Sequence, residues 1–104
     1  MNDKEILNKI KRSITSTDPD AEIYLYGSRA RGTHNIDSDY DILVITPRKS
    51  VTFEYELELR DSILDIEIET GVVISLMVYL KSDWNKKQFY SPLFINVSEE
   101  GIKI

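Results

Sequence analysis

The chain has 104 residues, of which 41% are hydrophobic, so it can form one compact core and we expect one domain spanning residues 1–104. Its formal net charge is -5, the acidic excess lies in residues 53–104 and there is no basic run, so extended nucleic-acid binding is not expected. The lack of cysteine excludes disulfides, thiolate metal sites and a cysteine nucleophile.

The N-terminal segment predicts a helix and shows no targeting signal. Residues 1–5 lack the basic start and apolar stretch of a signal peptide, and no apolar run approaches the ~20 residues that a membrane span needs. We therefore expect a cytoplasmic protein that does not bind membranes. If Asn2 or Asp3 caps the helix, its isoleucines fall on one stripe, and the segment 16–20, which contains Pro19, ends it.

The next segment predicts two strands separated by a compact polar region. In residues 21–26 aliphatic side chains occupy every second position. The segment is rich in strand formers and ends at a Gly-Ser turn. Residues 28–32 predict a very short helix, and residues 33–38 have the composition of a polar turn. Residues 40–45 then predict a buried strand, which is closed by Thr46 and Pro47.

Residues 53–69 fit two structures, because the segment 54–59 alternates like a strand while the leucines and isoleucines also form helical stripes. We predict one long helix, since the segment is longer than a normal strand and Gly71 is well placed to follow its end. Residues 72–80 then predict a third buried strand. Residues 82–84 begin a short helix, and residues 102–104 predict an edge strand.

Two acidic residues flank the start of the second strand. Asp39 and Asp41 bracket Tyr40, and alternate residues of a strand point to the same face. Both carboxylates therefore project together, roughly 6.5 to 7 Å apart along the chain. Two hard oxygen ligands suit Mg²⁺, which fills its remaining positions with water and the phosphate oxygens of a substrate. We predict that Asp39 and Asp41 are metal ligands and catalytic residues.

The turn that precedes these acids supplies groups that can bind a phosphate. Gly27 lets the backbone come close to a ligand, and the amides of Gly27 and Ser28 and the Ser28 hydroxyl can donate to it. Arg31, with Arg29 as a second candidate, can neutralise charge on the same phosphates. The predicted nucleotide-binding residues are therefore Gly27, Ser28 and Arg31.

These residues also carry a family resemblance. Residues 27–32, Gly-Ser-Arg-Ala-Arg-Gly, and residues 38–44, Ser-Asp-Tyr-Asp-Ile-Leu-Val, resemble the signature of the DNA polymerase beta-type nucleotidyltransferases, specifically their minimal stand-alone members. The resemblance implies an α+β fold, a small mixed β-sheet with helices packed against it. It also implies that Gly-Ser holds the distal phosphates, that the aspartates bind Mg²⁺, and that a third carboxylate on a later strand helps to activate the acceptor hydroxyl. The predicted order of elements agrees with that fold.

The strand that should carry the third carboxylate has none. Residues 72–80 read Val-Val-Ile-Ser-Leu-Met-Val-Tyr-Leu, with Ser75 near the expected place. A hydroxyl is a poor general base and a weaker metal ligand than a carboxylate, so activation of the acceptor is in question while triphosphate binding is not. Glu67 or Glu69 of the preceding helix is an alternative source, although solvated charges are the simpler interpretation of both.

Other features have two interpretations each. His34 is either a phosphate contact or an ordinary loop residue. The acidic helix 53–69 presents either a partner-binding face or a solvated one. The aromatic residues near the C-terminus either close the core or form a docking surface. They are Trp84, Phe89, Tyr90 and Phe94.

The leading functional hypothesis is an enzyme that transfers a nucleotidyl group, AMP from ATP, with Mg²⁺ to an acceptor hydroxyl. A chain of this size leaves no room for a large acceptor-binding domain, so we expect the acceptor to lie on a protein partner. The resemblance implies an antitoxin of the kind paired with a small, all-helical HEPN ribonuclease. The alternative is a catalytically degenerate nucleotide-binding module that restrains its partner by contact. Transfer to a small molecule such as an aminoglycoside is weaker, because such enzymes usually carry another domain.

Overall fold

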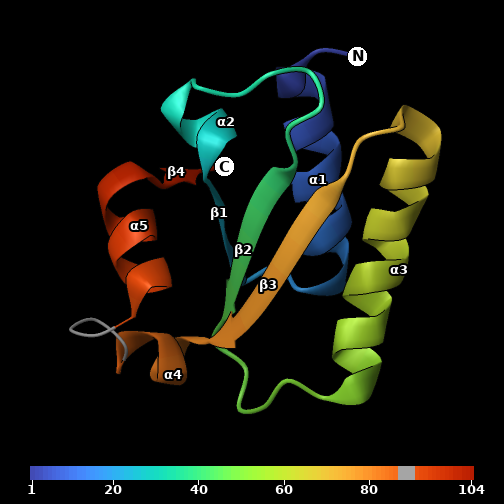
Figure 1. Cartoon of the computed structure of the whole chain (residues 1–104). Helices are drawn as coiled ribbons and strands as arrows, with labels where there is room; N and C mark the ends of the chain where they lie inside the picture. Colours follow the sequence, from blue (N-terminus) through green and yellow to red (C-terminus); the bar gives the residue numbers. More distant parts are fainter. Residues whose placement is uncertain (87–90) are drawn as a thin grey trace.

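The computed structural model of the protein describes residues 1–86 and 91–104, and Figure 1 shows its elements in chain order. None of the helices within these two ranges is long and apolar enough to cross a membrane. The elements are α1 (Asp3–Thr17), β1 (Glu22–Tyr26), α2 (Ser28–Arg31), β2 (Tyr40–Thr46), α3 (Phe53–Thr70), β3 (Ile74–Leu80), α4 (Lys81–Asn85), α5 (Pro92–Glu100) and β4 (Ile102–Lys103).

The strands of the described chain form one mixed sheet in the order β3-β2-β1-β4. β1 pairs antiparallel with β2 and with β4, whereas β2 and β3 are parallel. A parallel pair needs a crossover connection, and α3 supplies it on one face of the sheet (Figure 1). The structure thus confirms the predicted α+β class, a small mixed sheet with helices packed against it.

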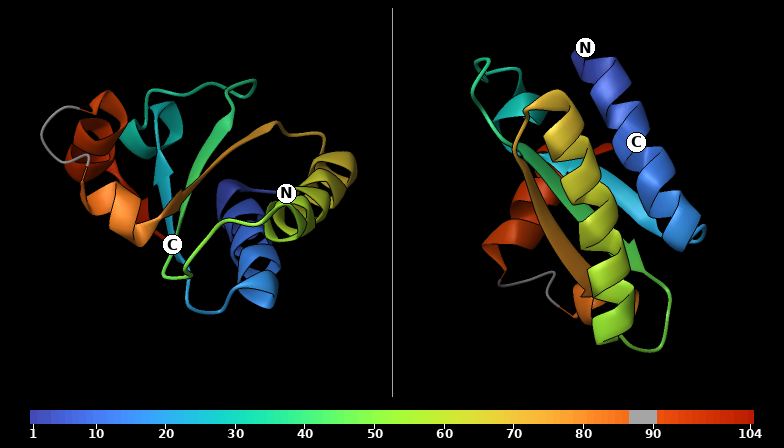
Figure 2. Two further views of the ribbon diagram at one scale, coloured as in Figure 1. Left: turned by 90° about the horizontal axis from the view of Figure 1, so that it is seen from below. Right: turned by 90° about the vertical axis from the view of Figure 1, so that its right-hand side faces the viewer.

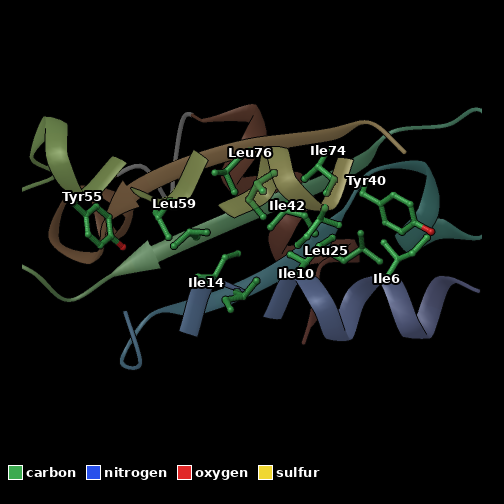
Figure 3. Packing of buried hydrophobic residues seen from close by; sticks show 14 residues of the cluster. Ile6, Ile10, Ile14, Leu25, Tyr40, Ile42, Tyr55, Leu59, Ile74 and Leu76 are labelled. Carbon is green, nitrogen blue, oxygen red and sulfur yellow. The ribbon is translucent and has the colours of Figure 1, made fainter. Parts of the chain in front are cut away.

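The main core lies between the sheet and the helices α1 and α3, which cover the same face (Figures 2 and 3). The predicted α1 stripe faces inward, and the side chain of Asn2 caps this helix by accepting a hydrogen bond from the Glu5 amide at 2.9 Å. Alternate residues of β2 point into this core. The α1 and β2 side chains concerned are Ile6, Ile10, Ile14, Tyr40, Ile42 and Val44.

The opposite face of the sheet is covered only in part. Leu43 and Ile45 of β2 point to this face and pack against Trp84 of α4 and Val97 of α5. Toward the start of β2 and β3 this cover ends, and Ser75 of β3 is exposed. One end of this face is therefore open, and it is the end at which β1 stops and β2 and β3 begin (Figure 1).

The ambiguous segment 53–69 is a helix, as predicted. The Thr52 side chain caps its start by accepting from the Tyr55 amide at 3.1 Å, and Gly71 ends it with a φ of 76°. Both apolar stripes seen in the sequence exist, but only one is buried in the core. The other stripe lies on the surface, which explains why alternation and helical spacing were both visible in this segment.

Two predictions differ from the structure, and one helix has no predicted counterpart. The sequence predicts a buried strand over residues 72–80, whereas β3 is an edge strand with only one face in the core, since within the described chain no strand pairs with its outer side. The first turn of α4 begins at Lys81 instead of residue 82. The helix α5 was not predicted at all.

The described members of the aromatic cluster help to close the core, which is the simpler of the two interpretations of this cluster. The rings of Trp84 and Phe94 lie 5.0 Å apart between centroids, and both pack beside Leu43 and Ile45 on the second face of the sheet. The other two members, residues 89 and 90, lie outside the described residues. This packing anchors α4 and α5 next to the open end of the sheet.

Candidate active site

The open end of the sheet brings the predicted site residues together. β1 ends one residue before Gly27, and its last residue pairs with Asp41 of β2, so the turn at Gly27 and Ser28 lies beside the start of β2. In the parallel ladder Asp41 lies opposite Ser75 of β3. Neighbouring residues of a ladder share a face, so Asp41 and Ser75 both point to the open side.

Gly27 is required by its conformation and by the space around it. Its φ of 77° and ψ of -158° lie in a region that is essentially restricted to glycine. A Cβ at this position would lie 2.1 Å from Oδ2 of Asp41. The glycine therefore lets the turn approach this carboxylate, in addition to leaving the backbone open toward a ligand.

Ser28 begins α2, a single helical turn that ends at Gly32 with a φ of 76°. Within the described residues its hydroxyl makes no hydrogen bond. The first amides of a helix have no partner inside that helix. The Ser28 hydroxyl and the amides that open α2 can therefore donate to an anion placed against this turn.

The two aspartates interact, as their spacing predicts. Asp39 is exposed and directly precedes β2, whereas Asp41 is half-buried within it. Burial raises the pKa of the Asp41 carboxyl above its ordinary range, and the negative charge of Asp39 raises it further. Among the nearby charges, Arg31 opposes this rise and Glu100 adds to it. The site thus holds crowded negative charge that a cation would neutralise.

Arg31 reaches the site together with an acid that the sequence analysis missed. Its Nη1 lies 3.0 Å from Oε1 of Glu100, at the end of α5, and the amide of Gly27 donates to the same oxygen at 3.2 Å. The Glu100 carboxylate thus contacts two of the groups predicted to bind phosphates. A usable signal was present, since Ser91 and Pro92 form a helix start and a glycine follows Glu100.

Arg29 is a structural residue and not a free phosphate ligand. Its side chain is 6% exposed and donates to three backbone carbonyls of residues 35–38, with its Nε 3.0 Å from the last of them. The guanidinium also lies 4.0 Å from the centre of the Tyr40 ring and pairs with Asp3. Arg29 therefore fixes the loop that leads into Asp39.

His34 belongs to the same arrangement of loop and helix. Its Nε2 lies 3.3 Å from a carboxylate oxygen of Asp3, and the hydroxyl of Tyr40 donates to the other oxygen. The contact ties the loop to the start of α1. These contacts support the interpretation of His34 as an ordinary loop residue.

The third acidic position has no carboxylate in the described chain. Ser75, which the sequence places near that position, lies beside Asp41 and on the same face. Glu67 accepts a hydrogen bond from the Ile74 amide at 2.9 Å, and Glu69 pairs with Lys9 at 3.0 Å. Both glutamates belong to α3, which packs on the other face of the sheet, so neither one replaces the missing acid.

The carboxylates of Asp39 and Asp41 suit a hard cation that takes its other coordinating oxygens from water and from a bound phosphate. No group of three or more His, Cys, Asp or Glu side chains suited to a metal occurs in residues 1–86 and 91–104. Asp39 and Asp41 alone suffice for Mg²⁺, which commonly uses one or two carboxylates together with water and phosphate oxygens. The raised pKa of Asp41 and the exposure of Asp39 agree with such a site.

Comparison with known sequences agrees with this geometry. The profile of the family described as "Nucleotidyltransferase domain" matches residues 7–103. The curated protein named "Putative protein adenylyltransferase MJ0604", from Methanocaldococcus jannaschii, is 36% identical over 98 residues, which cover 94% of this chain and 89% of that protein. These matches extend over both halves of the predicted motif.

Solved structures share the fold. One, described as a "putative minimal nucleotidyltransferase", has a TM-score of 0.64 and 21% identity, with coverage of 100% of this chain and 97% of the other. Another, described as a toxin-antitoxin with AMP-PNP, has a TM-score of 0.62 and 22% identity, with coverage of 92% and 69%. At this level of identity the similarity concerns the fold alone.

Proposed function

The chain belongs to the nucleotidyltransferase domain family, and from this premise we propose that it transfers the nucleotidyl group of a Mg²⁺-bound nucleoside triphosphate, ATP in the first instance, to a hydroxyl of a protein partner. The observation that carries the proposal is the placement of the Gly27-Ser28 turn directly beside Asp41, two residues after Asp39, at the open end of the sheet. The site that binds the triphosphate and the site that binds the cation then lie on one surface.

Each residue has a defined task in the proposed reaction. Gly27 and Ser28 hold the distal phosphates through their amides and the Ser28 hydroxyl, while Arg31 neutralises their charge. Asp39 and Asp41 would hold Mg²⁺, which when bound neutralises charge that develops on the reacting oxygens. The acceptor oxygen attacks the α-phosphorus, the bond to the bridging oxygen breaks, pyrophosphate leaves and the hydroxyl proton passes to water.

A protein acceptor is supported by the similar proteins. MJ0604 carries a protein adenylyltransferase name, and two solved structures with this fold are toxin-antitoxin proteins, one of them with AMP-PNP. We extend both features to this chain and propose a small helical partner of the HEPN type, encoded beside it. AMP is then the transferred group, and the acceptor is a side-chain hydroxyl of that partner.

A second function is favoured by one observation, the serine at the third acidic position. If a carboxylate is needed there, the protein would bind the nucleotide without turnover and restrain its partner by contact alone. The variant Ser75→Asp separates the two, because the register places residue 75 beside Asp41 on the exposed side. An added carboxylate at this position can ligate and act as a base without being buried.

The test uses ATP labelled at the α-phosphorus, with the purified protein and the product of each neighbouring gene. Label on the neighbour, lost in Asp41→Asn, supports transfer to a protein. Nucleotide binding without label in the original protein, with label in Ser75→Asp, supports the degenerate module. Label on an added aminoglycoside would support a small-molecule acceptor. Absence of any triphosphate binding in Mg²⁺ would sink the proposal altogether.

A further inference from the structure

The outward face of α3 carries an apolar stripe that nothing in the described chain covers. Its members, which we call the α3 stripe, recur at helical spacing along the side away from the core. Phe53 is 75% exposed, Ile68 is 74% exposed, and Leu57 and Leu64 are about half-exposed, at 46% and 50%. The helix is therefore apolar on two sides, one buried against α1 and the sheet and one facing outward.

The α3 stripe continues into a groove beside the edge of the sheet. A hollow of about 280 Å³ lies between Leu64 of α3 and Leu76 of β3. Arg60 lines this hollow, since it pairs with Glu56 at 2.8 Å and reaches across to the carbonyl of Leu76 at 3.5 Å. Leu64 of the stripe therefore lines the groove next to β3, whose outer side pairs with no strand of the described chain.

Acidic side chains border this surface on both sides. α3 carries 7 acidic residues and 1 basic residue, and helical geometry places Asp61 and Asp65 along one border of the stripe and Glu56 and Glu67 along the other. A second copy of the chain would bring the same acids against them, which is unfavourable. Nucleic acid and anionic lipid are repelled for the same reason. The surface fits an occupant that is apolar in the middle and basic at its borders.

The position of this surface connects it with the active site. Three residues, 71–73, separate the end of α3 from β3, and Val73 among them is 55% exposed. β3 is an edge strand paired with β2, so Ser75 and Asp41 lie close to this edge of the sheet, on the face opposite α3. A protein seated on the α3 stripe would have a neighbouring segment at the open end of the sheet.

We propose that the α3 stripe and the groove beside it bind a protein partner through an amphipathic helix whose apolar face is bordered by lysine and arginine. Such a helix would bury the four exposed apolar side chains and pair its charges with the acidic borders. This proposal rests on the proposed function only in that the same partner carries the acceptor hydroxyl. Binding at the stripe itself needs neither nucleotide nor metal.

The test uses two synthetic helical peptides of about 20 residues, a length at which a helix persists in water. Both carry leucines at helical spacing, and one has lysines where the other has glutamates beside them. Fluorescence anisotropy at about 150 mM salt should show binding of the lysine peptide only. Leu64→Ser with Ile68→Ser should weaken it about tenfold or more. Ile95→Ser, a substitution at an exposed apolar residue of α5, is the matched control and should leave it unchanged.

A second double variant tests the same surface without removing any apolar side chain. Asp61→Lys with Asp65→Lys changes only exposed positions and should abolish the preference for the lysine peptide. Equal binding of both peptides, or unchanged binding by folded stripe variants, would overturn the proposal. A dimer in sedimentation that the serine variants dissociate would overturn it in favour of a second copy. Titration of Mg-ATP into the same preparations tests the proposed function separately.

Discussion

The side-chain positions of Gly27, Arg29 and Glu100 each shape the site through another residue. Gly27 makes room for the Asp41 carboxylate, Arg29 holds the loop ahead of Asp39, and Glu100 occupies the Gly27 amide. Substitutions at these positions therefore change the geometry or the charge of the site without removing a group that touches the nucleotide.

Gly27→Ala should abolish binding of Mg-ATP, because the new Cβ would meet Oδ2 of Asp41 at 2.1 Å. The conformation of Gly27 should add a stability loss of about 1–3 kcal/mol. Gly32→Ala is the control, since it also has a positive φ, of 76°, but has nothing within 4 Å of the added carbon. Calorimetric titration and thermal melting should show a stability loss for both variants and an affinity loss for Gly27→Ala alone. Retained affinity in that variant would remove the turn from the site.

Glu100→Gln should tighten the binding of Mg-ATP, because the carboxylate now competes with phosphate for Arg31 and for the Gly27 amide. Loss of a partly exposed ion pair predicts an effect of roughly two- to tenfold. Glu99→Gln removes the same charge one residue away at an exposed position and should have a much smaller effect. Weaker binding by Glu100→Gln would show instead that this acid supports the turn.

At the scale of the elements, the strands and long helices could be predicted, because each has a strong period or a clear boundary residue. Asn2, Gly71 and the Gly27-Ser28 turn mark boundaries that the structure keeps. α5 could not be found from periodicity, since nine residues give too short a stripe, and its capping residues were the only usable signal. The burial of Arg29 was not visible either, because it depends on the folded loop 35–38 and on the ring of Tyr40.

Three elements meet at a buried acid, Asp18, at the end of α1. Its carboxylate accepts from the Thr46 hydroxyl of β2 at 2.6 Å and from the Tyr55 hydroxyl of α3 at 2.8 Å. Burial on its own would raise the pKa of Asp18. The hydrogen bonds from Thr46 and Tyr55, together with the Asp20 amide and Arg48, outweigh burial and lower this pKa below its ordinary value of 3.8.

Asp18→Ala should destabilise the protein by about 1–3 kcal/mol at neutral pH, because two buried hydroxyls lose their acceptor. A lowered pKa means that this stability is present above pH 3.8 and is lost as the pH falls through the pKa of the folded state. Thermal melting from neutral to acid pH should show the difference from Asp18→Ala shrinking below that value. Asp20→Ala, at an exposed neighbour, is the control. A difference that stays constant into acid would contradict the assigned role.

At the scale of the whole molecule, the two faces of the sheet have separate tasks. The face under α1 and α3 holds the main core, whereas α4 and α5 cover only part of the other face, and the end of α5 reaches the turn through Glu100 (Figure 1). Part of the net charge of -5 comes from Asp39, Asp41 and Glu100, which lie at the open end. Folding therefore brings these negative charges close to one another even when no cation is bound.

The crowding of acids at the open end predicts how the stability of the whole protein responds to pH and to Mg²⁺. Because the pKa of Asp41 is raised by burial and by Asp39, the metal-free protein should lose stability as the pH rises through a window above 3.8. Mg²⁺ should remove this loss and stabilise the protein by about 1.4 kcal/mol at ten times its dissociation constant. Asp41→Asn should melt higher than the original protein without metal and respond less to Mg²⁺. Sodium chloride at matched ionic strength controls for screening. An equal response to both salts, or a lower melting temperature of Asp41→Asn in metal-free buffer, would show that the aspartate is structural and that the cation site lies elsewhere.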